Sequence, residues 1–148
     1  MCGIAGWVNT KKENKKNLEK YSAVISRIID GQVHRGPDDS NVWSCTEAPV
    51  VLGHNRLAIL DLTASGAQPM IDSTSRWVIS YNGELYNYRQ LKQTLEKKFE
   101  IRFSGTSDTE VFLYGIIYLG IDEFLRMADG MFAASLYDRE EKILYLLR

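Results

Sequence analysis

Residues 1 to 8 read MCGIAGWV, and this short stretch sets the first expectations for the fold. Residues 3 to 8 are apolar and contain Gly3 and Gly6, a pattern that is typical of a buried β-strand. No basic segment leads into a long apolar stretch, as it would in a secretory signal. We therefore predict a cytoplasmic protein whose first strand directly follows Cys2.

The position of Cys2 favours catalysis by a residue at the chain terminus. Methionine aminopeptidases remove Met1 when the next side chain is small, and Cys2 would then carry both a thiol and a free α-amine. An α-amine has an ordinary pKa of about 7.7–8.0, so it can act as a general base without a separate histidine. A cysteine at position 2 also occurs by chance, so the rest of the sequence has to support this hypothesis.

Hydrophobic and turn patterns predict mixed helices and strands along the rest of the chain. Residues 17 to 31 carry apolar side chains on one helical face, and residues 107 to 110 have the form of a capping box before a helix that ends near Gly120. We also predict a loop at 36–39, a helix at 87–97, and strands at 41–46, 50–55, 76–81, 100–103, 131–137 and 143–147. Helices and strands do not alternate strictly, which favours an α+β fold. The last strand ends at Arg148 without a turn, so we expect the fold to be truncated at its C-terminus.

Composition and charge exclude several classes of protein. The chain has 148 residues, enough for one domain, and its 45% hydrophobic and 25% charged residues are typical of a soluble globular protein. The net charge of −1 argues against a nucleic-acid partner, and acidic residues interrupt the basic cluster from Lys11 to Lys20. No apolar run reaches the ~20 residues that a membrane span requires.

The cysteines and histidines do not form a recognisable metal or disulfide pattern. Cys2 and Cys45 are too few for a disulfide framework, and Cys45 fits a strand residue. Neither His34 nor His54 has the spacing of a metal ligand relative to them. We therefore predict no metal site and a structural role for both histidines.

Seven motifs along the chain together resemble one protein family. They are MCGIAG (1–6), HRGPDD (34–39), GHNRLAILDL (53–62), GAQPM (66–70), YNGELYNY (81–88), SGTSDTE (104–110) and DGMFAASLYD (129–138). In this order they resemble the glutaminase domain of asparagine synthetases, within the class II glutamine amidotransferases, over nearly the whole chain. The resemblance implies a four-layer αββα sandwich of the N-terminal-nucleophile hydrolase type. It implies that residues 1–148 form an incomplete glutaminase domain, with a C-terminal synthetase domain absent from this chain.

The resemblance assigns the catalytic roles to three residues. Cys2 matches the nucleophile that attacks the side-chain amide of glutamine, forms a thioester and releases ammonia. Asn82, through its side-chain amide, and Gly83, through its backbone N–H, match the oxyanion hole that stabilises the tetrahedral intermediate. Taken alone, Asn82-Gly83 is a common hairpin turn, but a segment with helical periodicity follows it.

The resemblance also assigns the groups that recognise L-glutamine. Arg56 matches the arginine that binds the α-carboxylate, for which a planar guanidinium is suited. Leu57 and Ile59 match backbone contacts beside it; between them the family usually has Ser where this chain has Ala58, a change that keeps the backbone contact. Glu84 and Asp108 match the acids that receive the α-ammonium group. Asp108 would also interact favourably with the dipole of the helix that it begins.

The implied reaction is hydrolysis of glutamine to glutamate and ammonia, without a metal or organic cofactor in this domain. Ammonia would pass to an ATP-dependent synthetase domain, in cis or in trans, and ATP and Mg²⁺ would bind there. Aspartate is the default acceptor, although the acceptor site is not in this chain. The resemblance is compatible with a homodimer and implies neither a nucleic-acid nor a membrane partner.

Two alternative hypotheses stay open at this point. Ser104 to Asp108 resembles the phosphate-binding loop of ATP pyrophosphatases, apart from Thr106, where those loops usually have a second glycine. The chain could then be a nucleotide-binding module. It could also be a catalytically silent truncated domain, because a retained Met1 would lock the nitrogen of Cys2 into a peptide bond or because the fold is incomplete.

Overall fold

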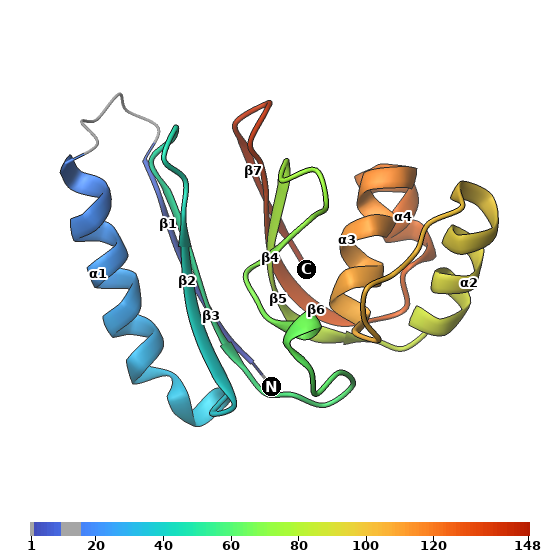
Figure 1. Ribbon diagram of the computed structural model, residues 1–148, viewed down its shortest axis with the longest axis horizontal. Helices are drawn as coiled ribbons and strands as arrows, with labels where there is room; N and C mark the ends of the chain where they lie inside the picture. The colour runs from blue at the N-terminus through green and yellow to red at the C-terminus, as the bar shows by residue number, and fades with distance from the viewer. Residues whose placement is uncertain (1, 10–15) are drawn as a thin grey trace.

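The computed structural model describes residues 2–9 and 16–148. Met1 and most of the basic cluster expected between Lys11 and Lys20 lie outside the described residues. The described part contains two β-sheets, with one helix beside the first sheet and three helices beside the second (Figure 1).

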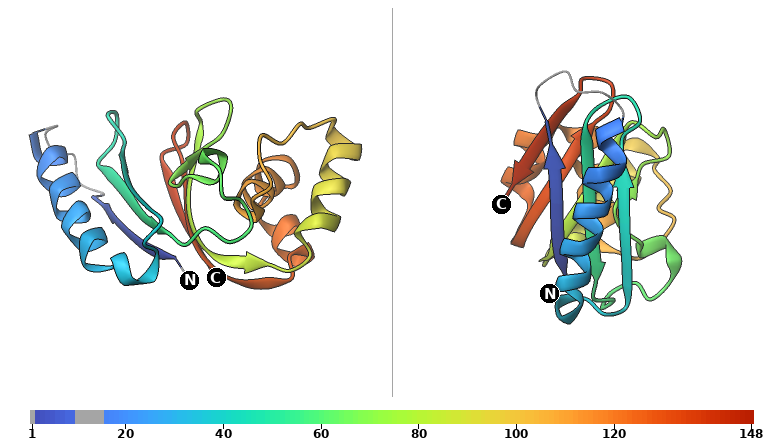
Figure 2. Two further views of the ribbon diagram at one scale, coloured as in Figure 1. Left: turned by 60° about the horizontal axis from the view of Figure 1, so that its bottom comes forward. Right: turned by 90° about the vertical axis from the view of Figure 1, so that its left-hand side faces the viewer.

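The first sheet is antiparallel and places β3 in its centre. Its strands are β1 (Gly3–Val8), β2 (Asp39–Ser44) and β3 (Val50–Arg56), in the order β1-β3-β2. Helix α1 (Lys16–Gly31) covers one face of this sheet, as Figure 2 shows. Ile25 and Ile29 pack against Val51, and Gly53 permits the close contact because a Cβ there would lie 2.7 Å from both isoleucine side chains. A 3₁₀ helix (Val33–Arg35) follows α1.

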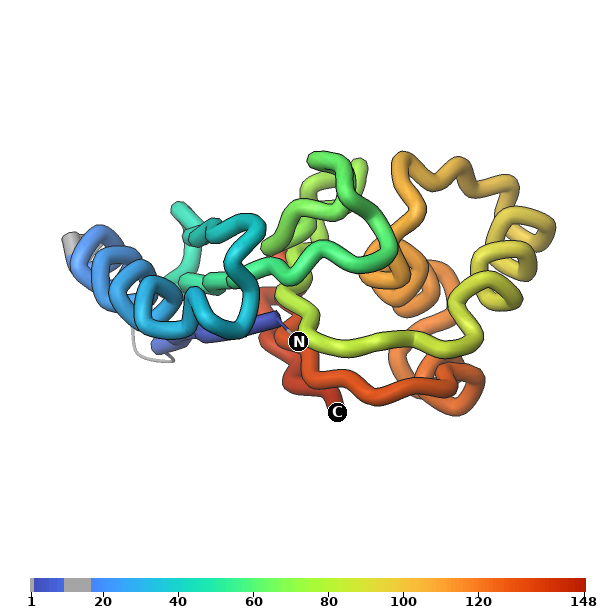
Figure 3. The backbone as a smooth tube through the Cα atoms, turned by 90° about the horizontal axis from the view of Figure 1, so that it is seen from below, coloured from blue at the N-terminus to red at the C-terminus, as the bar shows by residue number. Residues whose placement is uncertain are grey.

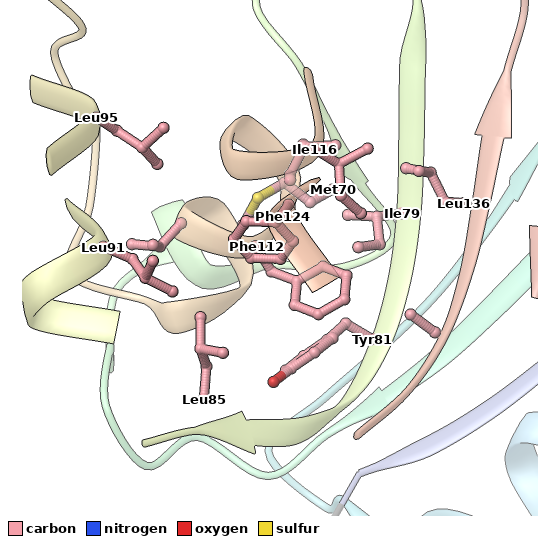
Figure 4. Close-up of a cluster of buried hydrophobic side chains, with 13 residues drawn as sticks. Met70, Ile79, Tyr81, Leu85, Leu91, Leu95, Phe112, Ile116, Phe124 and Leu136 are labelled. Atoms are coloured by element: carbon pink, nitrogen blue, oxygen red, sulfur yellow. The ribbon is translucent and has the colours of Figure 1, made fainter. Parts of the chain in front are cut away.

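The second sheet is also antiparallel and carries the larger core. Its strands run in the order β4 (Met70–Ile71), β5 (Trp77–Leu85), β6 (Gly130–Asp138) and β7 (Ile143–Leu147). Helices α2 (Tyr88–Phe99), α3 (Asp108–Leu119) and α4 (Ile121–Met127) cover it. Phe112 of α3 lies at the centre of an aromatic cluster, with its ring centroid 4.9 Å from that of Tyr81 and 5.0 Å from that of Phe124 (Figure 4). The ring centroid of Phe132 lies 4.8 Å from that of Phe112. Burying aromatic rings of this size contributes much of a core's stability.

The two sheets pack face to face, which completes four layers. Val50 and Leu52 of the first sheet meet Val78 and Tyr137 of the second, together with Cys45, which lies just after β2. The buried hydroxyl of Ser80 donates to the carbonyl of Gly53 at 3.1 Å and links β5 to β3. The predicted α+β fold and the αββα sandwich are therefore confirmed.

One predicted strand is absent from the structure, one helix was not predicted, and the alternative of a turn at Asn82-Gly83 is excluded. Residues 100–103 do not form a strand: α2 ends with Glu100 in the left-handed region (φ 55°), and Ile101 and Phe103 pack on the core without a sheet partner. Helix α4 was not predicted; a break at Gly120 (φ 84°) separates it from α3. Residues 82–85 continue strand β5, so Asn82-Gly83 is not a turn. Residues 100–103 have no neighbouring strand with which to pair, whereas residues 82–85 pair with β6.

His54 connects the two sheets beside the predicted oxyanion hole. Its side chain is 0% exposed, and Nε2 lies 3.0 Å from the carbonyl oxygen of Tyr81, to which it must donate. Burial, more than any neighbouring charge, lowers the pKa of His54 from its usual 6.5 to about 4. The imidazole is therefore neutral in the folded protein at physiological pH, which fits the structural role predicted for it.

This buried histidine gives a prediction for stability against pH. Because the unfolded chain protonates His54 near pH 6.5 and the folded chain only near pH 4, its contribution is complete above about pH 6.5 and is lost as the pH falls towards 4. We expect the free energy of unfolding to fall by roughly 1–2 kcal/mol between pH 7.5 and pH 5 from this group. Urea unfolding of His54→Gln should lack that part of the pH dependence, whereas His34→Gln, at an exposed position, should keep it. An unchanged pH dependence in His54→Gln would contradict the assignment.

Candidate active site

One pocket of about 400 Å³ contains every residue that the sequence singled out for catalysis or glutamine binding. These residues are Cys2, Arg56, Leu57, Ile59, Asn82, Gly83, Glu84 and Asp108. They come from the position just before β1, the end of β3, the segment after β3, the last part of β5 and the start of α3. The volume lies within the usual range for a small-molecule site. The fold thus brings together residues that are up to 106 positions apart, from 2 to 108.

Cys2 lies immediately before β1, an outer strand of the first sheet (Figure 1). The pairing of Gly3 with Asn55 places it beside the end of β3. The backbone N–H of Leu57 donates to the Cys2 sulfur at 3.3 Å, and Arg35 Nε donates to the Cys2 carbonyl at 3.2 Å. These two contacts orient a partly exposed thiol towards the pocket.

Asn82 and Gly83 lie within the last part of β5, where they pair with Ala133 and Phe132 of β6. A Cβ on Gly83 would lie 2.5 Å from the carbonyl oxygen of Met131, so the close approach of the two strands requires glycine. The side-chain oxygen of Asn82 is buried and has no hydrogen-bond partner within residues 2–9 and 16–148. Such a group is costly unless a ligand satisfies it.

Arg56 is the cation of the pocket. It is 8% exposed, so it is not a surface arginine, and its guanidinium donates to the carbonyls of Asp61 and of Thr63, the latter at 2.8 Å. Among the described residues it forms no ion pair. A buried charge without a counter-ion is unfavourable. An anionic ligand group would remove that cost.

Two acids of the pocket, Glu84 and Asp108, likewise form no ion pair in the described part of the chain. Asp108 is the first residue of α3, and its carboxylate accepts the N–H of Leu85 at 2.9 Å. Burial raises the pKa of Asp108, backbone hydrogen bonds oppose that shift, and the charge of Glu84 adds to it. A cationic ligand group would stabilise both carboxylates.

The segments around Arg56 are also ordered by neighbouring polar groups. The carboxylate of Asp38, in the loop predicted at 36–39, accepts the N–H of Ala58 at 2.8 Å, and the Asp38 N–H donates to the Arg56 carbonyl at 3.0 Å. The predicted loop therefore shapes the pocket from outside. The side chain of Ile59 is exposed at its rim.

The structure contradicts the hypothesis of a phosphate-binding loop at Ser104 to Asp108. The backbone N–H groups of Ser104 and Gly105 donate to the carboxylate of Glu110, at 2.7 and 2.9 Å. The N–H of Thr106 donates to Asp61 at 2.8 Å. Because the chain's own carboxylates occupy these donors, they are not available to a phosphate. One half of the predicted capping box is present, because the Ser107 hydroxyl accepts the N–H of Glu110 at 3.2 Å, whereas the Glu110 carboxylate accepts from Ser104 and Gly105.

Asp61, Gln68 and Tyr81 are polar residues of the pocket that reasoning from the sequence missed. Gln68 accepts the N–H of Tyr81 at 2.6 Å and so extends the pairing of β5 beyond the short strand β4. Asp61, Thr63 and Ser65 have the spacing of a local aspartate turn, which is a signal that could have been read. The long-range contact of Gln68 leaves no such local signal.

The described residues hold no group of three or more potential metal-ligating side chains. The predictions that this domain needs neither a metal nor an organic cofactor stay predictions. No helix in residues 2–9 and 16–148 is long and apolar enough to cross a membrane.

The four-layer sandwich, with a cysteine ahead of its first strand and a pocket at that cysteine, defines an amidotransferase fold of the N-terminal-nucleophile type. A solved structure supports this class: glutamine phosphoribosylpyrophosphate amidotransferase from Bacillus subtilis, in complex with ADP and GMP, superposes with a TM-score of 0.52 and 28% identity over 62% of this chain and 21% of that one. The family described as "Glutamine amidotransferase domain" matches residues 1–148, and the chain belongs to that family.

Within this family, the chain is similar to proteins named asparagine synthetase. Asparagine synthetase [glutamine-hydrolyzing] 3 of Bacillus subtilis (strain 168) is 39% identical over all of this chain, which covers 23% of that protein. Asparagine synthetase B [glutamine-hydrolyzing] of Escherichia coli (strain K12) is 37% identical over 99% of this chain and 24% of that protein. The chain thus spans about a quarter of the length of these relatives. The family supports a glutamine amidotransferase domain over the silent and nucleotide-binding alternatives.

Proposed function

We propose that this domain hydrolyses L-glutamine to glutamate and ammonia, with Cys2 as nucleophile after removal of Met1. One observation carries the proposal: the Cys2 thiol, a cation and acids that form no ion pair among the described residues, and a buried side-chain amide line the same pocket. Glutamine carries the matching groups, which are an α-carboxylate, an α-ammonium and a side-chain amide.

The proposed chemistry begins with proton transfer from the Cys2 thiol to the α-amine of the same residue. The sulfur attacks the side-chain carbonyl carbon of glutamine, and the negative oxygen that forms accepts hydrogen bonds from the Asn82 amide and the Gly83 N–H. The intermediate collapses, the C–N bond breaks, and the proton held by the α-amine leaves with ammonia. Water then attacks the thioester, which releases glutamate and restores the thiol.

Recognition of glutamine would rest on the charged groups of the pocket. Arg56 can hold the α-carboxylate with two N–H donors, while Asp108 and Glu84 receive the α-ammonium. Backbone groups of Leu57 and Ile59 complete the contacts beside Arg56. Holding both ends of the amino acid fixes the side-chain amide against the sulfur, which is the main benefit of orientation in catalysis.

The use of the ammonia is a proposal that extends beyond this chain. The relatives named asparagine synthetase are about four times longer than the segment matched here. We propose a synthetase domain, in cis or in trans, that binds ATP and Mg²⁺ and amidates a carboxylate, with aspartate as the default acceptor. A cytoplasmic location and a homodimer are part of the same proposal.

Arg56→Lys tests the proposed binding of glutamine. A lysine keeps the charge but has no planar fork, so the KM for glutamine should rise about 10- to 100-fold, the range for a lost charge-assisted hydrogen bond of about 1.5–3 kcal/mol. Release of glutamate and of ammonia, measured at varied glutamine, gives both KM and kcat.

Arg76→Lys is the matched control for this variant. Arg76 pairs with Asp138 through two N–H groups, at 3.0 and 2.6 Å, outside the pocket. Its replacement removes a guanidinium fork without touching the pocket, so KM should not change. Equal KM values for Arg56→Lys and wild type would remove Arg56 from the binding site.

A further inference from the structure

We propose that Asp61 is a positioning residue that holds the two glutamine-binding segments of the pocket together. The two segments are residues 57–66, which hold the guanidinium of Arg56, and residues 103–107, which lead into Asp108. This inference rests on the proposed binding of glutamine by Arg56 and Asp108. Asp61 thereby affects the affinity for glutamine, although it does not contact the reacting atoms.

The carboxylate of Asp61 is a buried acceptor that is filled by hydrogen bonds. Asp61 is 5% exposed and forms no ion pair in the described part of the chain. One oxygen accepts the N–H and the hydroxyl of Thr63, at 2.8 and 2.6 Å. The other accepts the hydroxyl of Ser65 at 3.1 Å and, from 45 positions away, the N–H of Thr106 at 2.8 Å. These donors, Thr63 first, hold the pKa of Asp61 well below its usual range.

The backbone of the same turn holds the predicted carboxylate-binding arginine. The carbonyls of Asp61 and Thr63 both accept from the guanidinium of Arg56. The Asp61 carboxylate shapes this turn through Thr63 and Ser65, so it indirectly fixes the direction of the guanidinium. Figure 3 shows the segment after β3 (green) running from the first sheet towards α3 before it returns to β4.

The contact with Thr106 fixes the second segment. Thr106 precedes Asp108 by two residues, and its hydroxyl also donates to the Leu60 carbonyl at 3.3 Å. A Cβ on Gly105 would lie 2.5 Å from the Asp61 carboxylate, so the two segments are in close contact. Loss of the carboxylate would therefore loosen the placement of Arg56 and Asp108 relative to each other.

Asp61→Asn tests this role because an amide replaces one of the two acceptor oxygens with a donor. Two of the four hydrogen bonds are then lost, whichever way the amide is turned. We expect the KM for glutamine to rise about tenfold, within the cost of losing hydrogen bonds to a charged group, and kcat to change less than about threefold. Hydrolysis of glutamine by the processed chain provides both values.

Asp72→Asn is a control for a purely structural effect. Asp72 is also 5% exposed, and it accepts the N–H and hydroxyl of Thr74 and the N–H of Trp77, in the same kind of turn but outside the pocket. Both variants should lower the free energy of unfolding by a similar amount, but only Asp61→Asn should raise KM. If the two variants have the same KM, or if Asp61→Asn lowers kcat alone, the positioning role is wrong.

Labelling of Cys2 separates a failure of this inference from a failure of the proposed function. Iodoacetamide needs no binding site, so it should label Asp61→Asn at the wild-type rate. A glutamine-like diazo-ketone at low concentration should label Asp61→Asn about tenfold more slowly than it labels wild type. Equal diazo-ketone rates in both proteins would overturn the role of Asp61. Absence of labelling in the wild type would instead overturn the proposed function.

A milder variant applies if Asp61→Asn does not fold. Ser65→Ala removes one hydroxyl donor from the same carboxylate oxygen that accepts the Thr106 N–H. We expect a KM about threefold above that of wild type, because a threefold change corresponds to about half of the net free energy of one hydrogen bond. An unchanged KM in this folded variant would also overturn the inference.

Discussion

Cys2→Ala should abolish glutamine hydrolysis and leave the fold intact. Removal of a catalytic nucleophile costs many orders of magnitude in rate, so we expect kcat to fall by at least about 10⁴-fold. Cys2 is only partly buried and its sulfur contacts the N–H and the carbonyl of Leu57, at 3.3 and 3.9 Å, so the free energy of unfolding should change by less than about 1 kcal/mol. Ammonia release and thermal unfolding measure the two effects on the same sample.

Cys45→Ala controls for the loss of a thiol elsewhere. Cys45 is buried between the sheets, and its sulfur lies 3.3 Å from the carboxylate of Glu47, away from the pocket. This variant should lose some stability but keep the wild-type kcat. If Cys2→Ala still released ammonia at the rate of wild type, Cys2 could not be the nucleophile.

Asn82→Ala should mainly slow the chemical step. The proposed oxyanion forms only after the sulfur attacks, so its hydrogen bonds act on kcat more than on KM. Loss of one donor to such an oxyanion lowers kcat by about 10²–10³-fold. We expect that fall in kcat, with KM within about threefold of wild type, in steady-state hydrolysis of glutamine.

Asn87→Ala is the control for an amide just beyond the same strand. Asn87 connects to the segment after α4, through the carbonyl of Met127 and the N–H of Asp129, and does not line the pocket. Its loss should leave kcat unchanged. A wild-type kcat in Asn82→Ala, or an effect on KM alone, would exclude Asn82 from the oxyanion hole.

Regular, strongly amphipathic segments of the fold could be predicted from the sequence. The strand at Gly3–Val8 and the helix up to Gly31 match within a residue, because their apolar residues face a single neighbouring layer. The strand at 100–103 was predicted from the same kind of pattern and is wrong, because no strand lies beside it. The layer architecture was predicted from the family resemblance, because the spacing of hydrophobic residues along the chain does not indicate which sheets pack together.

Local sequence patterns likewise predict only some of the residues of the pocket. Cys2 could be noticed from its position alone, whereas Arg56 and Asn82 carry local patterns that equally fit a surface arginine and a hairpin turn. Only the combined motifs distinguished these readings. The role of Gln68 could not be predicted, because it depends on a contact with the main chain of Tyr81, 13 positions away. No local spacing of residues indicates such a contact.

The proposed mechanism requires the sulfur and the amino nitrogen of a terminal Cys2 to act together on a bound amide. The most direct measurement is peptide mapping by mass spectrometry after reaction with a glutamine-like diazo-ketone, for a chain beginning at Cys2 and for one that keeps Met1. We predict a single adduct on Cys2 in the processed chain and much slower labelling when Met1 is present, because an amide nitrogen cannot accept the thiol proton. An adduct on another residue, or equally fast labelling of both chains, would contradict the account.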